Sequence, residues 1–233
     1  YPRTGASFIA SNYAYYLSGK NVSTTLCEIP GVSSYLYVAL DFEKRTRGGA
    51  GQQEGTLLLQ GRRLKIKAAN PFHQAGEVTQ QDLMQWFFTQ FKSTSALIID
   101  ASASIQKETT AWLMGMADQI WVVVDPDFPR LSHVVYTENA PSWWKTNADK
   151  IRIILNKWHS DYSPTGSIIR KIEGTFSIWD QRMKAPEVNG IIPALDGKKI
   201  IKAQLEARLY LEMFPEEAEL LHELADLDKG RFL

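Results

Sequence analysis

Four short apolar segments, separated by segments of helical periodicity, constrain the fold of this chain more than any other feature. They cover residues 22–28, 96–100, 119–124 and 151–156. Apolar runs of this length are typical of strands that are buried on both faces of a parallel sheet. Because helical patterns fall between them, we expect βαβ units and an α/β fold, with a mostly parallel central sheet flanked by helices on both faces.

Composition narrows the class of protein further. The chain has 233 residues, a length that suits one α/β domain, and we expect residues 1–233 to form one. Its 26 basic and 26 acidic residues leave no net charge, so no overall field draws it to nucleic acid or to an anionic membrane. The one cysteine, Cys27, lies in an apolar run. This excludes a disulfide framework and predicts a buried thiol in a reducing compartment.

The sequence carries no membrane or targeting signal. No apolar run approaches the ~20 residues that span a bilayer, and the first residues lack a signal-peptide pattern. We therefore expect a cytoplasmic protein. Because the chain begins with Tyr1 rather than Met, we also expect the native chain to extend further toward its N-terminus.

The first residues share part of the phosphate-binding motif GxxxxGK[ST]. They read Tyr-Pro-Arg-Thr-Gly-Ala-Ser-Phe and lead into a helical pattern. In a working motif backbone N–H groups cradle phosphates, the lysine reaches the β- and γ-phosphates, and the hydroxyl binds Mg²⁺. Gly5 and Ser7 fit this pattern, whereas Ala6 stands where the lysine should be. Taken alone, these residues also fit an ordinary turn at the start of a helix.

Acidic residues end three of the strand-like segments. Glu28 and Asp100 fall at the carboxyl ends of their strands, the edge where open α/β sheets bind ligands, and the segment before Asp100 has the shape of a Walker B strand. Asp125 and Asp127 follow the third strand and could hold a metal. Asp-Pro-Asp is also common turn chemistry, since Asp caps a helix and Pro fixes φ, and we favour that interpretation.

Shorter patterns complete the expected secondary structure. Helices are expected at residues 7–19, 35–42, 79–91, 107–117 and 131–144, the last with a break at Pro141, and a hairpin joins residues 57–59 to 64–68. The aromatic stripe of the third helix is interpreted as core rather than as a cofactor site. Gly-rich residues 48–55 predict a surface excursion, because no strand precedes them and no helix follows. A last helix should start at Pro215 with an acidic first turn, unlike an anionic-membrane anchor.

The order of these motifs resembles the ParA/MinD family of deviant P-loop ATPases, over nearly the whole chain. Its parts are the Gly-x-Ser loop entering a helix, the strand that ends in Asp100, and the segments Ala-Asp-Gln-Ile-Trp-Val-Val-Val-Asp-Pro-Asp, Ile-Leu-Asn-Lys and Ile-Ile-Pro. The resemblance implies a P-loop fold of three layers and a site for ATP or ADP with Mg²⁺, if nucleotide binds at all. The residues implied are Arg3, Thr4, Gly5, Ala6, Ser7 and Phe8 for the phosphates, Asn156, Lys157 and Pro193 for adenine, and Ser7 and Asp100 for Mg²⁺.

Three departures from the family pattern bear on catalysis. Ala6 replaces the Walker lysine, and Tyr1 aligns with the family's second, signature lysine. Glu28 matches the first acid of the family's paired Asp-x-Asp, but Pro30 falls where the water-activating Asp would be. Phosphoryl transfer needs charge neutralisation and an oriented water, and groups for both tasks are lost. Arg3 could supply a compensating charge.

The resemblance to the family's TadZ/CpaE-like branch, which has degenerate Walker A loops, implies a function. We expect a pseudo-ATPase, acting as a dimer, that helps to place a pilus or secretion machine at a cell pole or the inner membrane face through protein partners. A receiver-like domain would precede it. The alternatives are a slowly hydrolysing ATP-binding switch and a DNA-partition protein. Lys198, Lys199, Lys202 and Arg208 would serve the latter, although a solvated helix face explains them equally well.

Overall fold

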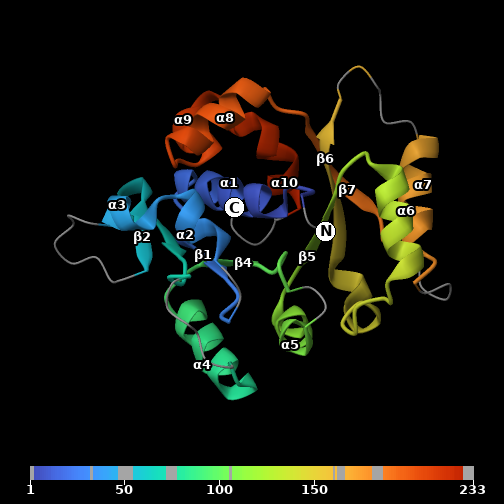
Figure 1. Ribbon diagram of the computed structural model, residues 1–233, viewed down its shortest axis with the longest axis horizontal. Coiled ribbons are helices and arrows are strands. Elements are labelled where there is room, and N and C mark those ends of the chain that lie inside the picture. The colour runs from blue at the N-terminus through green and yellow to red at the C-terminus, as the bar shows by residue number, and fades with distance from the viewer. Residues whose placement is uncertain are drawn as a thin grey trace. The chain divides into compact units, whose positions relative to one another are not determined.

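The chain divides into two compact units. The computed structural model describes residues 3–31, 34–46, 55–71, 78–104, 107–159, 161, 166–179 and 186–227. The first unit holds the described residues within Tyr1–Ala6, Ile105–Leu195 and His222–Lys229, and the second holds those within Ser7–Ser104, Asp196–Leu221 and Gly230–Leu233. Figure 1 follows the elements along the chain by colour.

The second unit is built on a mixed sheet of four strands in the order β2-β3-β1-β4. The strands are β1 (Thr24–Glu28), β2 (Thr56–Leu59), β3 (Leu64–Lys67) and β4 (Ala96–Asp100). β1 runs parallel to β3 and β4, and β2 pairs with β3 antiparallel, which confirms the predicted hairpin. The register of β1 and β4 sets Glu28 beside Asp100. Because β4 lies at the edge of this sheet, most of its residues are half-buried and not fully buried as expected.

Helices cover both faces of this sheet. They are α1 (Ala6–Gly19), α2 (Tyr35–Ala39), α3 (Phe42–Thr46), α4 (Gln80–Phe91), α8 (Gly197–Leu205) and α9 (Tyr210–Met213), with 3₁₀ turns η1 (Gln60–Arg62) and η3 (Pro215–Leu221). Figure 1 shows α1, α2, α8 and α9 on one side of β1 and α4 on the other. Ala14, Leu26 and Ile66 belong to the core on the first side. On β1, Cys27 is buried as predicted, and burial raises the pKa of its thiol to about 12.

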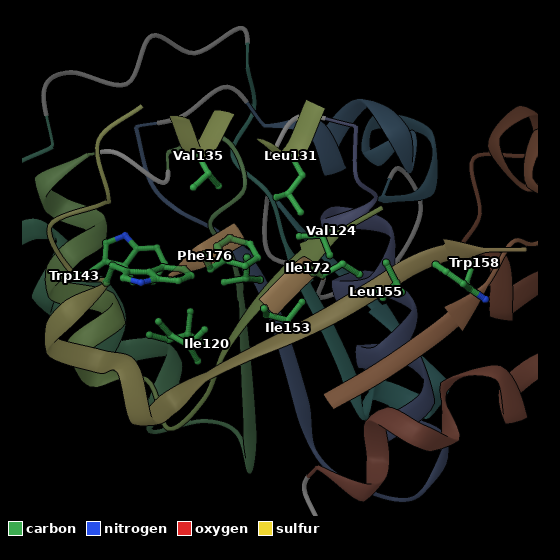
Figure 2. Packing of buried hydrophobic residues seen from close by; sticks show 13 residues of the cluster. Ile120, Val124, Leu131, Val135, Trp143, Ile153, Leu155, Trp158, Ile172 and Phe176 are labelled. Atoms are coloured by element: carbon green, nitrogen blue, oxygen red, sulfur yellow. The ribbon is translucent and has the colours of Figure 1, made fainter. Parts of the chain in front are cut away.

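The first unit has a parallel sheet of three strands in the order β5-β6-β7. They are β5 (Ile120–Val124), β6 (Ile151–Trp158) and β7 (Val188–Pro193), with helices α5 (Glu108–Met116), α6 (Phe128–Thr137), α7 (Gly166–Phe176) and α10 (His222–Asp226) and the 3₁₀ turn η2 (Lys145–Lys150). Figure 2 shows how Ile153 and Leu155 of β6 face Leu131 of α6 and Phe176 of α7. Because side chains alternate between the two faces of a strand, residues two apart, such as Ile153 and Leu155, enter the same core.

Both sheets with their helices confirm the predicted α/β class, and the parallel pairings confirm the βαβ reading of the apolar segments. Some helix limits were wrong. The helix expected at 131–144 begins at Phe128, because Asp127 caps it and Pro129 fits its first turn. It ends at Thr137. Trp143 and Trp144 therefore lie beyond the end of this helix, and their side chains are buried in the core.

Two further helix predictions were wrong in detail. The segment 35–42 divides into α2 and α3 because Asp41 between them has a φ of 45°, outside the helical region. The helix expected from Pro215 begins as the 3₁₀ turn η3 and becomes α-helical only at α10. The Thr79 start was right, since Thr79 and Asp82 form a capping box on α4. The Gly-rich residues 48–54 lie outside the described residues.

Candidate functional site

The loop before α1 is held in place by the end of β6. Asn156 Nδ2 donates a hydrogen bond of 2.8 Å to the carbonyl of Thr4, and both residues are buried. Lys157 Nζ donates one of 2.5 Å to the carbonyl of Arg3. Strand β6 therefore fixes two consecutive peptide groups of the loop, through the Asn-Lys pair that was predicted to begin the adenine segment.

Gly5 is required in this loop for two reasons. Its φ of +93° lies in the left-handed region that favours glycine. A Cβ atom at this position would stand 2.4 Å from Asn156 Nδ2, inside any permitted contact distance. The close approach of the Asn156 side chain to the loop therefore depends on the missing side chain at Gly5.

Charged groups at the end of β5 also surround the loop. The Asp125 carboxylate accepts a hydrogen bond of 2.5 Å from Arg130 and lies 3.6 Å from Lys157 Nζ. A pocket of about 10 Å³, lined by Thr4, Val124, Asp125, Arg130 and Leu131, leaves room there for about one water molecule. Arg130 and Lys157 are thus both already paired with the Asp125 carboxylate.

Asp127 does what the turn interpretation predicted. Its carboxylate accepts a hydrogen bond of 3.1 Å from the Arg130 backbone N–H and so caps the N-terminus of α6. Among the described residues, no group of three or more His, Cys, Asp or Glu side chains could hold a metal. Asp125 and Asp127 therefore fit a helix cap with its ion pair better than a metal site.

In the second unit, α1 and β4 bring hydroxyl and carboxylate oxygens together. Ser7 Oγ lies 3.2 Å from Ser102 Oγ, and the backbone N–H of Ser102 donates a hydrogen bond of 3.0 Å to Asp100 Oδ1. Hydroxyl and carboxylate oxygens are the ligands that Mg²⁺ prefers, and Mg²⁺ commonly takes only one or two of them from the protein. Ser7 and Asp100 therefore fit a Mg²⁺ ion, which would neutralise phosphate charge when bound.

The N-terminus of α1 follows the loop directly. α1 is 14 residues long and has no acidic residue in its first turn, so the dipole at its N-terminus favours an anion. The carbonyl of Phe8 accepts hydrogen bonds from Ser11 and Asn12 farther along the helix. The ring of Phe8 packs edge-on against Tyr210 in the second unit, 5.7 Å between centroids.

The carboxylate of Glu28 is used to hold α2. It accepts hydrogen bonds from the backbone N–H groups of Tyr35 (2.7 Å) and Leu36 (3.1 Å) and a very short one from the Ser34 hydroxyl. Burial raises the pKa of Glu28, the three hydrogen bonds lower it, and nearby Asp100 raises it. Glu28 is therefore a helix-capping group in this structure.

The predicted site residues fall into two groups, one in each unit. Arg3, Thr4 and Gly5 meet Asn156 and Lys157, and Pro193 lies at the same end of the sheet, paired in register with Trp158. In the second unit the neighbours are Ser7, Ser102, Asp100 and Glu28. Ala6 is the first residue of α1, and Tyr1 lies outside the described residues.

Sequence reasoning missed three residues that shape the site. Ser102 links Ser7 to Asp100, and its position two residues after an Asp is the pattern of an Asx-turn, which could have identified it. Ser34 caps α2, as Ser does before a helix. Arg130 could not have been found, because nothing in the sequence shows that it folds back onto Asp125.

Solved structures share this fold. A ParA family ATPase from Chlorobium tepidum TLS has a TM-score of 0.63 and 16% identity, covering 99% of this chain and 95% of its own. A chain of the MinC:MinD cell division protein complex of Aquifex aeolicus has a TM-score of 0.66 and 16% identity, covering 99% of this chain and 93% of its own. The septum site-determining protein MinD of Pyrococcus horikoshii OT3, complexed with Mg-ADP, has a TM-score of 0.61 and 14% identity. The match covers 100% of this chain and 95% of that protein.

These likenesses show a ParA/MinD-type P-loop fold for nearly the whole chain. No protein-family model and no curated protein matches the sequence itself. Among the described residues, no helix is long and apolar enough to cross a membrane.

Proposed function

We propose that the chain is a ParA/MinD-like pseudo-ATPase, one domain that binds nucleotide weakly or not at all and works by protein contact. Its role would be that of a localisation or assembly factor for a pilus or secretion machine of the TadZ/CpaE kind. It would act as a dimer in the cytoplasm, at a pole or the inner membrane face. The observation that carries this proposal is Ala6, in the place of the lysine that reaches the β- and γ-phosphates.

Among the described residues, Lys157 and Arg130 do not replace the lost lysine. Lys157 Nζ is bonded to the Arg3 carbonyl and lies near Asp125, and Arg130 is paired with the same Asp125. To reach a phosphate, either cation would have to give up its present partners. The side chain of Arg3 is exposed, and it leaves the loop at a different position from Ala6.

The group that would activate the attacking water is also lost. Pro30 stands at the place of the second acid and has no proton-accepting side chain. Glu28, the first acid, has its oxygens engaged by the start of α2. The loss of the acid affects the transition state of hydrolysis, where water orientation matters most. The loss of the lysine removes charge stabilisation there and also a contact to the phosphates of bound nucleotide.

The second candidate is an ATP-binding switch that hydrolyses slowly. The arrangement of Ser7, Ser102 and Asp100 favours it, because it preserves an oxygen set suited to Mg²⁺. The N-terminus of α1 could hold a phosphate without any lysine. The MinD structure from Pyrococcus horikoshii is complexed with Mg-ADP, which supports ATP or ADP with Mg²⁺ as the ligand of this candidate.

A calorimetric titration with ATP and Mg²⁺ separates the two candidates. The pseudo-ATPase proposal predicts a dissociation constant above about 100 μM and at least about tenfold tighter binding by Ala6→Lys, because a lysine adds a charge-assisted hydrogen bond. Gly19→Lys is the matched control: it adds the same charge at the exposed far end of α1 and should change nothing. Micromolar affinity in the unmodified protein would overturn the proposal in favour of the switch.

A further inference from the structure

The second unit has an open groove that the phosphate loop does not use. It encloses about 480 Å³ and is lined by Ser34, Tyr35, Val38, Ala39, Gln204 and Ala207. Large apolar side chains beside it face solvent, with exposed fractions of 55% for Tyr35, 66% for Val38, 57% for Ile201 and 82% for Leu205. Exposed apolar side chains gathered around one concave surface mark a binding site more often than scattered ones do.

Basic side chains border the groove on the far side of this apolar stripe. At about 100° per residue around α8, the order is Gln204, Ile201, Leu205, Lys198, Lys202. The groove, the apolar stripe and the basic stripe therefore follow one another around the helix. Lys198 and Lys202 are exposed and form no ion pair with other described residues, whereas Lys199 is paired with Glu217.

The walls of the groove are fixed before anything binds. Leu36 of α2 and Leu40, which directly follows that helix, share a buried cluster with Leu209, which follows α8. The Arg45 guanidinium donates hydrogen bonds of 2.7 Å to the Ala207 carbonyl and 2.8 Å to the Glu212 carboxylate, and the carboxylate of Glu28 holds the start of α2. A preformed groove costs little reorganisation on binding.

We propose that this groove binds an amphipathic helix of a partner protein. Apolar side chains at positions i, i+3 or i+4, and i+7 of that helix sit between Val38 and Leu205, which is the common helix-in-groove arrangement. Acidic side chains on one flank of the helix face Lys198 and Lys202, which fixes its direction by charge complementarity. This docking needs no nucleotide and so goes beyond the function proposed above.

The shape of the surface favours a helix over the other classes of partner. An anionic bilayer is flat on this scale and would meet Ile201, Leu205 and the lysines while leaving the concave wall of α2 unfilled. The phosphates of a nucleic acid would contact only the lysines, and exposed Val38 and Leu205 would add nothing to its affinity. Only a narrow, convex and partly acidic partner matches the groove, the apolar stripe and the charge together.

The test is a selection for binding to the full chain. The peptides are helical, about 18 residues long, and come from a displayed random library. We expect the enriched peptides to carry apolar residues at helical spacing with Asp or Glu on one flank. An enriched peptide should lose at least about tenfold in affinity for Leu205→Glu and for Lys202→Glu. Replacing its facing acid by Lys should restore binding to Lys202→Glu. Tyr136→Glu, which changes an equally exposed aromatic residue in the first unit, should leave binding unchanged.

Three results would overturn the proposal. The first is a selection that yields no amphipathic acidic helix, or peptides whose affinity does not depend on Leu205. The second is cosedimentation with phosphatidylglycerol vesicles, or binding to duplex DNA, that Leu205→Glu abolishes. The third is sedimentation velocity showing that Leu205→Glu turns a dimer into a monomer, which would assign the face to a second copy of the chain. Leu205 is exposed, so the variant should fold, as circular dichroism will verify.

Discussion

Gly5 combines an unusual backbone conformation with a close contact, and we expect its replacement to be costly. Gly5→Ala places a Cβ atom at a φ of +93° and 2.4 Å from Asn156 Nδ2. We predict a loss of about 1–3 kcal/mol in the free energy of unfolding, measured with urea. Gly174→Ala in α7 is the matched control. Nothing lies within 4 Å of its added Cβ atom, and it should stabilise the protein by up to about 1 kcal/mol. Equal effects of the two substitutions would contradict this account of the loop.

Glu28 predicts a pH dependence of stability. Its folded-state pKa is raised above the ordinary value of 4.5, mainly by burial. Its contribution to stability is therefore fully present below pH 4.5 and is lost as the pH rises through the folded-state pKa, because the folded state holds the extra proton between those values.

Glu28→Gln removes this titration. The unfolding free energy of the variant minus that of the unmodified protein should therefore rise as the pH is raised from below 4.5 to about 7. Urea unfolding at a series of pH values measures the difference. A difference that stays constant or falls with pH would show that the three hydrogen bonds outweigh burial.

The side chain of Asp127 caps the N-terminus of helix α6. Asp127→Ala should cost about 1 kcal/mol of unfolding free energy, because the Arg130 N–H loses its acceptor. Asp127→Asn should be nearly neutral, since Asn is an equally good N-cap. If Asp127 were instead a metal ligand, both variants would lose metal binding. Mg²⁺ would then raise the melting temperature of the unmodified protein alone.

Elements set by local sequence could be predicted, and those set by distant contacts could not. The helix start at Thr79 and the β2–β3 hairpin were predicted because their signals lie within a few residues. The end of α6 was missed because Trp143 and Trp144 are drawn into the core by α7. The use of Glu28 as a cap for α2 was missed as well, since its partners lie seven and eight residues away.

At the scale of the whole molecule, charge balance argues against the DNA-partition reading. With 26 basic and 26 acidic residues, the chain has no overall positive field that would draw it to the phosphates of a duplex. We predict no gel shift of nonspecific duplex DNA at about 150 mM salt, with or without ATP. Micromolar binding whose affinity falls steeply with salt, and which Lys202→Glu weakens, would revive that reading.

The fold of the whole chain was predicted from the sequence more completely than the contacts within the site. The order of motifs predicted a fold shared with ParA and MinD structures at 14–16% identity. It also placed Asp100 at the end of its strand, and it placed Asn156 near the end of β6, which continues to Trp158. It could not show that Asn156 binds the loop carbonyl, or that Asp125 pairs with both nearby cations. Those contacts depend on side-chain directions that only the folded chain defines.

ATP turnover is the most direct test of the central claim that phosphate chemistry was lost with Ala6 and Pro30. The measurement is phosphate release by the purified protein with Mg²⁺ and saturating ATP, beside Asp100→Ala, which removes the carboxylate proposed to hold Mg²⁺. The account predicts the same background rate for both proteins. Turnover by the unmodified protein that Asp100→Ala abolishes would contradict it.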